Sequence, residues 1–174
     1  MTSTISYNIS LSPIGHLLVA QNEFGLCSVL LGDTQDATFI ELQNRFTGNT
    51  LERNEDKLKL SSRYLLSWLN ALSKHEKPIP KDIKLDLNGS PFQQRVWHAL
   101  RKLPCGTTIS YSELAKSIHQ PNAVRAVASA CAANPIELLV PCHRVIKSDG
   151  SLAGYRWGIE RKRALLQREG VQIE

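Results

Sequence analysis

Apolar and polar positions alternate in short runs along the first part of the chain, and Gly or Pro separates one run from the next. Such alternation is typical of strands in a small antiparallel sheet. Apolar residues at helical spacing follow, and then comes a polar stretch rich in Lys and Pro. We expect this part, residues 1–88, to be a small α/β domain. The predicted strands are 5–10, 16–20 and 26–31, the predicted helices 35–46 and 57–72, and the predicted linker 74–86.

The second half of the chain carries stronger helix signals. Ser90–Gln93 and Ser110–Glu113 are both capping-box patterns, which predict that a helix begins after each serine. A third helix is predicted at 122–133, because Asn134 precedes a proline and is therefore restricted away from helical backbone. Two short helices joined by a tight turn predict a helix-turn-helix. The expected fold class is α+β, with a mainly helical, winged helix-turn-helix-like domain at 89–174.

The third predicted helix is rich in alanine, whose side chain is too short to hydrogen-bond with base edges. Only Arg125 has the reach to do so. Such a helix suits a close, sequence-indifferent approach to a DNA groove, with the arginine inserted into the base stack or directed to a phosphate. Alternatively, the alanines only allow the helix to pack tightly on its neighbours. The helix sequence leaves both interpretations open.

Charge is distributed unevenly over the 174 residues. Residues 1–90 hold 9 Lys and Arg against 10 Asp and Glu, a net charge of −1, whereas residues 91–174 hold 12 against 6, a net charge of +6. A basic half indicates a polyanionic partner or an ordinary solvated basic surface, and charge does not decide between them.

No secretory signal and no long apolar run is found in the sequence, and its hydrophobic content of 42% is ordinary for a globular protein. We expect a cytoplasmic protein, or a nuclear one if the source is eukaryotic. The cysteines are scattered and form no C-x-x-C pair, so we expect reduced thiols. They are Cys27, Cys105, Cys131 and Cys142.

Cys142 differs from the other cysteines in its setting. Residues 138–140 are an apolar run, interpreted as a buried strand, and Pro141 ends it so that the thiol is presented in a turn or at a helix start. The neighbouring His143 and Arg144 would favour the thiolate. Because adjacent side chains point in different directions, a water relay between His143 and the sulfur is the more natural geometry.

Zinc binding and cysteine proteolysis are the competing chemistries for Cys142. A Cys142-His143 pair with only distant cysteines lacks the ligand spacing of a structural zinc site. A cysteine protease needs its His and Asn or Asp separated in sequence, and no local signature of that class surrounds Cys142. Neither rival accounts for the basic half, and we expect neither a metal nor another cofactor.

The segment Pro141-Cys142-His143-Arg144-Val145 resembles the motif of the O6-alkylguanine-DNA alkyltransferase family, for which it is highly specific. The resemblance runs from Phe92 to about Gly170 and includes Asn134-Pro135, Gly154-Tyr155-Arg156-Trp157-Gly158 and Arg168-Glu169-Gly170. Bacterial members and the C-terminal half of the bacterial adaptive-response protein are the most alike, whereas residues 1–88 match only in general pattern. That protein has a cysteine-rich zinc domain upstream, for which this chain has neither the length nor the cysteines, so we expect a bacterial stand-alone repair protein.

The resemblance implies an irreversible, stoichiometric transfer of the alkyl group from guanine O6 to Cys142, after the damaged nucleotide has been flipped out of the duplex. O4-alkylthymine is a second candidate substrate. His143, acting through water, would generate the thiolate, and Glu169 would accept from its other ring nitrogen. Asn134 would be the hinge between the recognition helix and the cysteine turn.

Further roles in DNA and substrate binding follow from the resemblance. Arg125 would fill the gap left by the flipped nucleotide, Ala126 would lie in the groove, and Tyr111 would donate to guanine N3. The carbonyls of Cys142 and Val145 would accept from the exocyclic amine, the N–H of Arg156 would face O6, and Tyr155 and Trp157 would wall the pocket. The expected partner is double-stranded DNA, bound through its minor groove largely independently of sequence by a monomer.

The chain departs from mammalian members mainly at the expected pocket rim, which we assign to Glu137, Ala153 and Trp157. The last two positions are glycine in those relatives. Cys27 lacks a second N-terminal cysteine with which to bind zinc. Relatives that bind alkylated DNA without transfer carry Trp in place of the cysteine, so Cys142 favours an enzyme over a binding module. The alanine-rich helix argues against a transcription regulator that reads an operator.

Overall fold

The computed structural model describes residues 3–71 and 80–173, which fall into two compact units. The first unit holds residues 3–71, 80–87 and 135–137. The second holds residues 88–134 and 138–173. Residues 135–137 therefore belong to the first unit although the sequence places them between two parts of the second. Part of the predicted linker, residues 74–79, lies outside the described residues.

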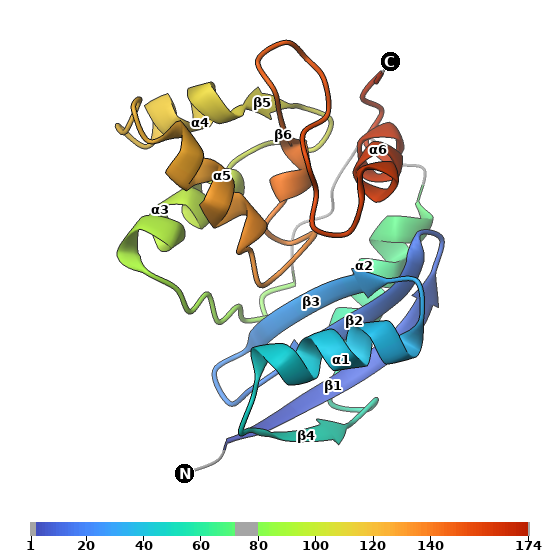
Figure 1. The fold of residues 1–174 in the computed structure, drawn as a ribbon. Coiled ribbons are helices and arrows are strands. Elements are labelled where there is room, and N and C mark those ends of the chain that lie inside the picture. Colours follow the sequence, from blue (N-terminus) through green and yellow to red (C-terminus); the bar gives the residue numbers. More distant parts are fainter. Residues whose placement is uncertain (1–2, 72–79, 174) are drawn as a thin grey trace. The chain divides into compact units, whose positions relative to one another are not determined.

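A four-stranded sheet in the order β3-β2-β1-β4 forms the centre of the first unit (Figure 1). The strands β1 (Thr4–Ser12), β2 (Gly15–Gln21) and β3 (Leu26–Gly32) form the predicted antiparallel meander. The edge strand β4 (Thr50–Arg53) pairs in parallel with β1 and was not predicted. Its four residues are mostly exposed and carry no apolar alternation, so the sequence gives no strand signal there.

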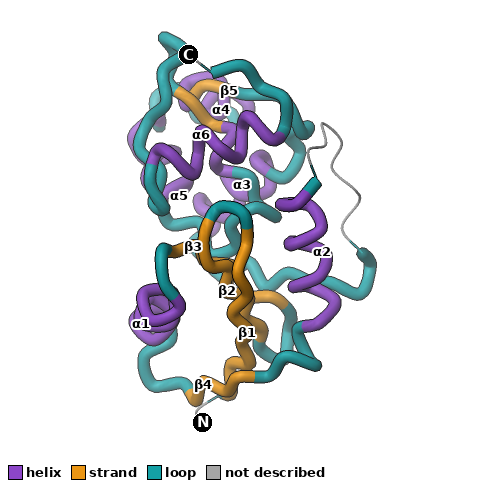
Figure 2. Tube along the Cα trace, turned by 90° about the vertical axis from the view of Figure 1, so that its right-hand side faces the viewer, coloured by secondary structure: helices purple, strands orange, loops and turns teal. Residues whose placement is uncertain are grey.

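The two predicted helices of this unit are confirmed as α1 (Gln35–Arg45) and α2 (Lys59–Asn70). They lie on opposite sides of the sheet, as Figure 2 shows. The hydroxyl of Thr34 accepts from the N–H of Ala37 and so caps the start of α1. The strands β2 and β3 are almost continuously buried because both of their faces are covered.

The described end of the predicted linker pairs with the first residue of β3 through an isolated bridge between Leu85 and Leu26. Leu26 donates to the carbonyl of Lys84 and accepts from the N–H of Asp86, at 2.8 and 2.7 Å. A side chain at Gly25 would lie 2.6 Å from the Lys84 carbonyl oxygen, so this close approach requires glycine. The polar composition of the segment suggested a linker, and for residues 84–86 that interpretation is wrong.

The second unit is built on three helices that pack on one another, α3 (Pro91–Leu100), α4 (Tyr111–Ser117) and α5 (Val124–Ala132). Both predicted capping boxes are present, at Ser90 and Ser110. The remaining elements are the short parallel strands β5 (Ile109–Ser110) and β6 (Val145–Ile146), the 3₁₀ turn η1 (Cys142–Arg144) and α6 (Ile159–Arg168).

The observed architecture confirms the predicted α+β class, with a sheet-containing first unit and a mainly helical second one. The predicted buried strand at 138–140 is wrong. All three residues are buried, but they form a turn in which Leu138 adopts a φ of 72°. Burial rather than sheet pairing therefore accounts for this apolar run. Among the described residues, no helix combines the length and apolarity needed to span a membrane.

Candidate active site

Cys142 opens the 3₁₀ turn η1, directly after Pro141. The next residues form β6, which pairs with β5 so that Ile109 lies opposite Val145 and Ser110 opposite Ile146. Tyr111 begins α4 immediately after β5. This short pairing thus ties the start of α4 to the cysteine turn, and it brings together two segments that the sequence separates widely.

The amide of Asn134 holds the cysteine turn from the end of α5. Its Nδ2 donates to the carbonyl of Val140 at 2.6 Å and lies 3.4 Å from the sulfur of Cys142. Asn134 is fully buried, and Cys142 is 6% exposed. A donor aimed at sulfur favours the thiolate over the thiol. Asn134 therefore connects the end of α5 to the cysteine turn and also contacts the sulfur, while its role as a hinge stays a prediction.

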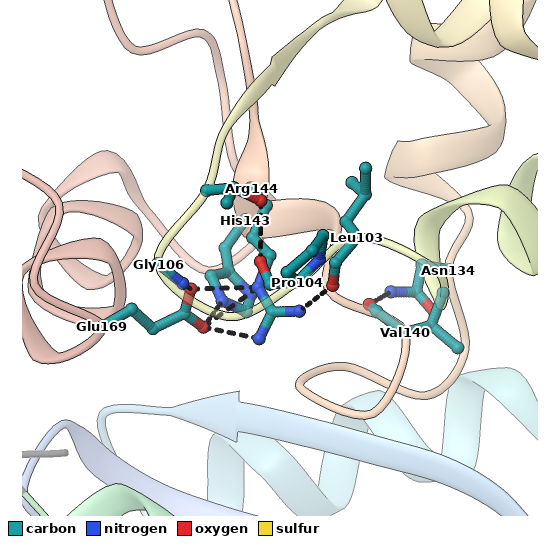
Figure 3. A network of polar contacts seen from close by, with 9 residues as sticks. Leu103, Pro104, Gly106, Asn134, Val140, His143, Arg144 and Glu169 are labelled. Atoms are coloured by element: carbon teal, nitrogen blue, oxygen red, sulfur yellow. Dashed lines mark hydrogen bonds and ion pairs between the residues drawn. The ribbon is translucent and has the colours of Figure 1, made fainter. Parts of the chain in front are cut away.

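His143 and Arg144 both bind the carboxylate of Glu169, which follows the last turn of α6 (Figure 3). Nε2 of His143 lies 2.7 Å from Oε1 of Glu169. Arg144 donates to the same carboxylate from Nε, at 2.9 Å to Oε2, and from Nη2, at 2.9 Å to Oε1. The three side chains are essentially inaccessible to solvent. The predicted pairing of His143 with Glu169 is thus present in the structure.

The position of Arg144 corrects the sequence-based interpretation, which gave its charge to the thiol. Its guanidinium lies on Glu169, and its third nitrogen donates to the carbonyl of Leu103 at 2.6 Å. The N–H of Gly106 completes the shell around Glu169, at 3.1 Å from Oε2. Nothing in the local sequence signals this arrangement, because Leu103 and Gly106 belong to a turn about 40 residues away from Arg144.

Glu169 stays ionised in this setting. Burial by itself would raise the pKa of the carboxyl group, but hydrogen bonds and electrostatic interactions with His143 and Arg144 outweigh it and hold the pKa at about 2. The anion can therefore orient the imidazole of His143. With Nε2 directed to Glu169, Nδ1 lies on the opposite edge of the ring.

Tyr111 and Lys162 are connected to β6, the strand that follows the cysteine turn. Burial raises the pKa of Tyr111 to about 12, and nearby Cys131 and Cys142 add to the effect, so the phenol keeps its proton. Lys162 is fully buried and donates to the carbonyl of Val145. Its ammonium lies 6.0 Å from the centre of the Tyr111 ring. Sequence reasoning missed Lys162, because it reads as an ordinary charged position in a basic helix.

The packing interpretation of the alanines in α5 is confirmed on one face of the helix, and its role in approaching DNA stays a prediction. Val127, Ala130 and Cys131 are buried, and the carbonyl of Ala130 accepts from the indole of Trp97 at 2.8 Å. Arg125 and Ala126 are exposed on the outer face. Small residues thus let α5 pack closely on α3 and also leave a low surface from which Arg125 projects.

The segment that follows β6 carries the remaining predicted residues. Tyr155, Trp157 and Ala153 are partly buried, and the exposed Arg156 places its guanidinium 5.4 Å from the centre of the Trp157 ring. Glu137 does not lie at an exposed rim. It is fully buried in the first unit, where its N–H donates to the carbonyl of Val29. The assignment of Glu137 to the pocket rim is therefore wrong.

Within residues 3–71 and 80–173, no cluster of three or more His, Cys, Asp or Glu side chains is arranged to hold a metal ion. The site offers a nucleophilic sulfur, an amide that contacts it, and an imidazole oriented by a buried carboxylate.

Comparison with known proteins extends this picture. The family described as 6-O-methylguanine DNA methyltransferase, DNA binding domain, matches residues 91–171. A crystal structure of Mycobacterium tuberculosis O6-methylguanine methyltransferase is 36% identical, with a TM-score of 0.70 over 95% of this chain and 92% of that one. The chain belongs to the O6-methylguanine-DNA methyltransferase family.

A second relative and a DNA complex add to this comparison. The Escherichia coli bifunctional transcriptional activator/DNA repair enzyme Ada is 46% identical over 171 residues, which cover 98% of this chain and 47% of Ada. The Mycobacterium tuberculosis OGT in complex with DNA has a TM-score of 0.71 and 36% identity, over 94% of this chain and 92% of that one. The chain spans about half the length of the curated family members it matches. The roles of individual site residues remain predictions.

Proposed function

We propose that this protein repairs O6-alkylguanine in DNA by moving the alkyl group irreversibly to Cys142. The observation that carries the proposal is the combined geometry of Asn134, Cys142, His143 and Glu169 in a member of this family. Its relatives include an enzyme named for DNA repair and a structure in complex with DNA. The protein acts once, because a thioether offers no ready route back to the thiol.

The proposed reaction begins with the loss of the Cys142 proton through water to His143. Glu169 accepts the N–H from the other side of the ring and stabilises the imidazolium that forms. The Asn134 amide stabilises the resulting thiolate. The sulfur then attacks the alkyl carbon, so that a sulfur–carbon bond forms as the bond between that carbon and guanine O6 breaks. The electron pair of the broken bond remains on the guanine, which takes up the proton that Cys142 gave to His143.

Substrate binding in this proposal requires the damaged nucleotide to leave the base stack, since its O6 group cannot be reached inside a duplex. Arg125 projects from the exposed face of α5 and takes the place of the flipped nucleotide. The neutral phenol of Tyr111 donates to guanine N3. The carbonyl of Val145 already accepts from Lys162, but it retains a second lone pair for the exocyclic amine.

The proposed partner is double-stranded DNA, bound by a monomer through the minor groove with little dependence on sequence. The basic second half supplies phosphate contacts, and the short exposed face of α5 allows close approach. O4-alkylthymine is a second candidate substrate. The protein is expected in the compartment that holds the DNA, the cytoplasm of a bacterium or the nucleus of a eukaryote.

Chromatography of the DNA bases tests the proposal. A duplex with one O6-methylguanine is incubated with excess protein, digested and analysed for its nucleosides. We expect O6-methylguanine to be replaced by guanine with the wild type and to persist with Cys142→Ala, which should still bind the duplex. Recovery of an abasic site or free base, or repair by Cys142→Ala, would contradict transfer to Cys142.

A further inference from the structure

The buried carboxylate of Glu169 serves two positively charged partners rather than one. Oε1 contacts His143 and the NH2 group of Arg144, while Oε2 accepts from Nε of Arg144 and from the N–H of Gly106. Glu169 therefore differs from the carboxylate of a simple His–carboxylate pair, because a permanently charged guanidinium already balances its negative charge.

Arg144 is fixed to the fold independently of His143. Its third nitrogen donates to the carbonyl of Leu103 at 2.6 Å, and the side chain is 1% exposed. Gly106 closes the same turn at a φ of +79°, and a side chain there would lie 2.9 Å from the Glu169 carbonyl oxygen. Hydrogen bonds thus link the turn, Arg144 and Glu169, and this network orients the imidazole of His143 through its contact with Glu169.

This arrangement affects whether the imidazole of His143 is neutral or protonated. Beside a bare buried carboxylate, an imidazole is driven towards its protonated form, in which it cannot act as a base. Beside a carboxylate that an arginine already neutralises, the imidazole keeps the hydrogen bond that orients it without that drive. We propose that Arg144 is a positioning residue that balances the charge of Glu169 and so keeps His143 neutral in the resting protein. The inference rests on the proposed role of His143 as the base.

Other ionisable groups of the second unit lie near this network. Cys142 shares the turn η1, Lys162 is buried on α6, and Tyr111 at the start of α4 keeps its proton up to a pH of about 12. The positive charge of Lys162 acts in the same direction as that of Arg144, and its ammonium donates to the carbonyls of Val145 and Ala153. Arg144 donates to both carboxylate oxygens of Glu169, so its removal changes the charge balance of that carboxylate directly.

Three variants separate charge from geometry. Arg144→Gln removes the charge and leaves Glu169 uncompensated. Arg144→Lys keeps a positive charge but loses the two-pronged geometry of the guanidinium. The double variant Arg144→Gln/Glu169→Gln removes both charges, so it contains no unbalanced buried ion and provides a folded reference if the single variant is unstable.

The measurement is the single-turnover rate of methyl transfer as a function of pH, together with the NMR titration of the His143 ring in each protein. For Arg144→Gln we expect the acid limb of the rate profile and the protonation midpoint of His143 to move upward together, by about one pH unit or more. Arg144→Lys should be slower but keep the wild-type midpoint. The double variant should return the midpoint to the wild-type value or below it.

An unchanged His143 midpoint in Arg144→Gln would overturn the inference, even if transfer were slow, because a purely structural arginine predicts that result. If Arg144→Gln does not fold, a midpoint in the double variant that lies above the wild-type value would also overturn it. Absence of methyl transfer in the wild type would instead contradict the proposed function, and the NMR titration still tests the charge balance in that case.

Discussion

The side-chain amide of Asn134 lies 3.4 Å from the sulfur of Cys142, although Asn134 follows the end of α5 and Cys142 opens η1 eight positions later. The same amide donates to the carbonyl of Val140 at 2.6 Å. One residue at the end of α5 therefore both shapes the turn that presents the thiol and contacts the reacting atom. A movement of α5 would therefore shift the Asn134 amide and change its contact with the sulfur.

Replacing Asn134 should affect rate and stability together. Asn134→Ala leaves the Val140 carbonyl without its amide donor, and we expect a loss of about 1–3 kcal/mol in the free energy of unfolding. Loss of the contact with the sulfur should slow transfer by roughly 10²- to 10³-fold. Urea denaturation and single-turnover kinetics check the two effects. Asn44→Ala, at an exposed position of α1, is the matched control and should change neither.

The acid stability of the protein should report the ionisation of Glu169. Its pKa of about 2 lies below the ordinary value of 4.5, so ionised Glu169 stabilises the fold above about pH 4.5, and this contribution is lost as the pH falls towards 2. The shift corresponds to about 3 kcal/mol. We expect Glu169→Gln to lower the melting temperature at neutral pH and to flatten its pH dependence between about pH 5 and 3.

Glu160→Gln is the control for this experiment, because the Glu160 side chain is 89% exposed on the same helix. It should leave the pH dependence of the melting temperature unchanged. If Glu169→Gln shows the same acid transition as the wild type, the network does not stabilise the ionised carboxylate of Glu169 over its protonated form.

Much of the local structure could be predicted, because its causes are local. Each capping box lies within four residues, and the helices begin where Ser90 and Ser110 predict. The strand β4 and the pairing of Leu26 with residues 84–86 could not be predicted. Both segments are polar, and each is held in place by hydrogen bonds to a strand distant in sequence, β1 for β4 and β3 for residues 84–86. The turn at Leu138 was mistaken for a strand because burial produces the same apolar run in either conformation.

The candidate site divides in the same way. The Cys142 motif was clear in the sequence, and the resemblance supplied Glu169 and Asn134. The roles of Arg144 and Lys162 were missed because each depends on a contact distant in sequence, to Glu169 in one case and to the carbonyl of Val145 in the other. The residue type alone does not show whether a charged side chain is buried or solvated, so these roles become visible only in the folded structure.

Arg125 should matter more on duplex DNA than on a single strand. It projects from the exposed face of α5, and its proposed place in the base stack has value only where a partner base must be replaced. We expect Arg125→Ala to slow methyl transfer by roughly tenfold or more on a duplex and by much less on a single strand. Arg53→Ala, on the exposed strand β4, should slow neither. Equal losses on both substrates would argue against the role of Arg125 in flipping.

Trp157 should limit the size of the alkyl group that is accepted. Its ring is partly buried, with the guanidinium of Arg156 5.4 Å from the ring centre. We expect O6-benzylguanine to inactivate the wild type poorly and Trp157→Gly roughly ten- to a hundredfold faster. The melting temperature of the variant controls for unfolding. If Trp157→Gly lowers the melting temperature without faster inactivation, the indole supports the fold and does not limit the pocket.

Intact-mass analysis during incubation with excess O6-methylguanine duplex tests the central claim most directly. Each protein molecule should gain one methyl group, the gain should map to the peptide that contains Cys142, and repair should stop when all of the protein is modified. Continued repair beyond one equivalent, or a methyl group on Cys131 or another residue, would contradict stoichiometric transfer to Cys142.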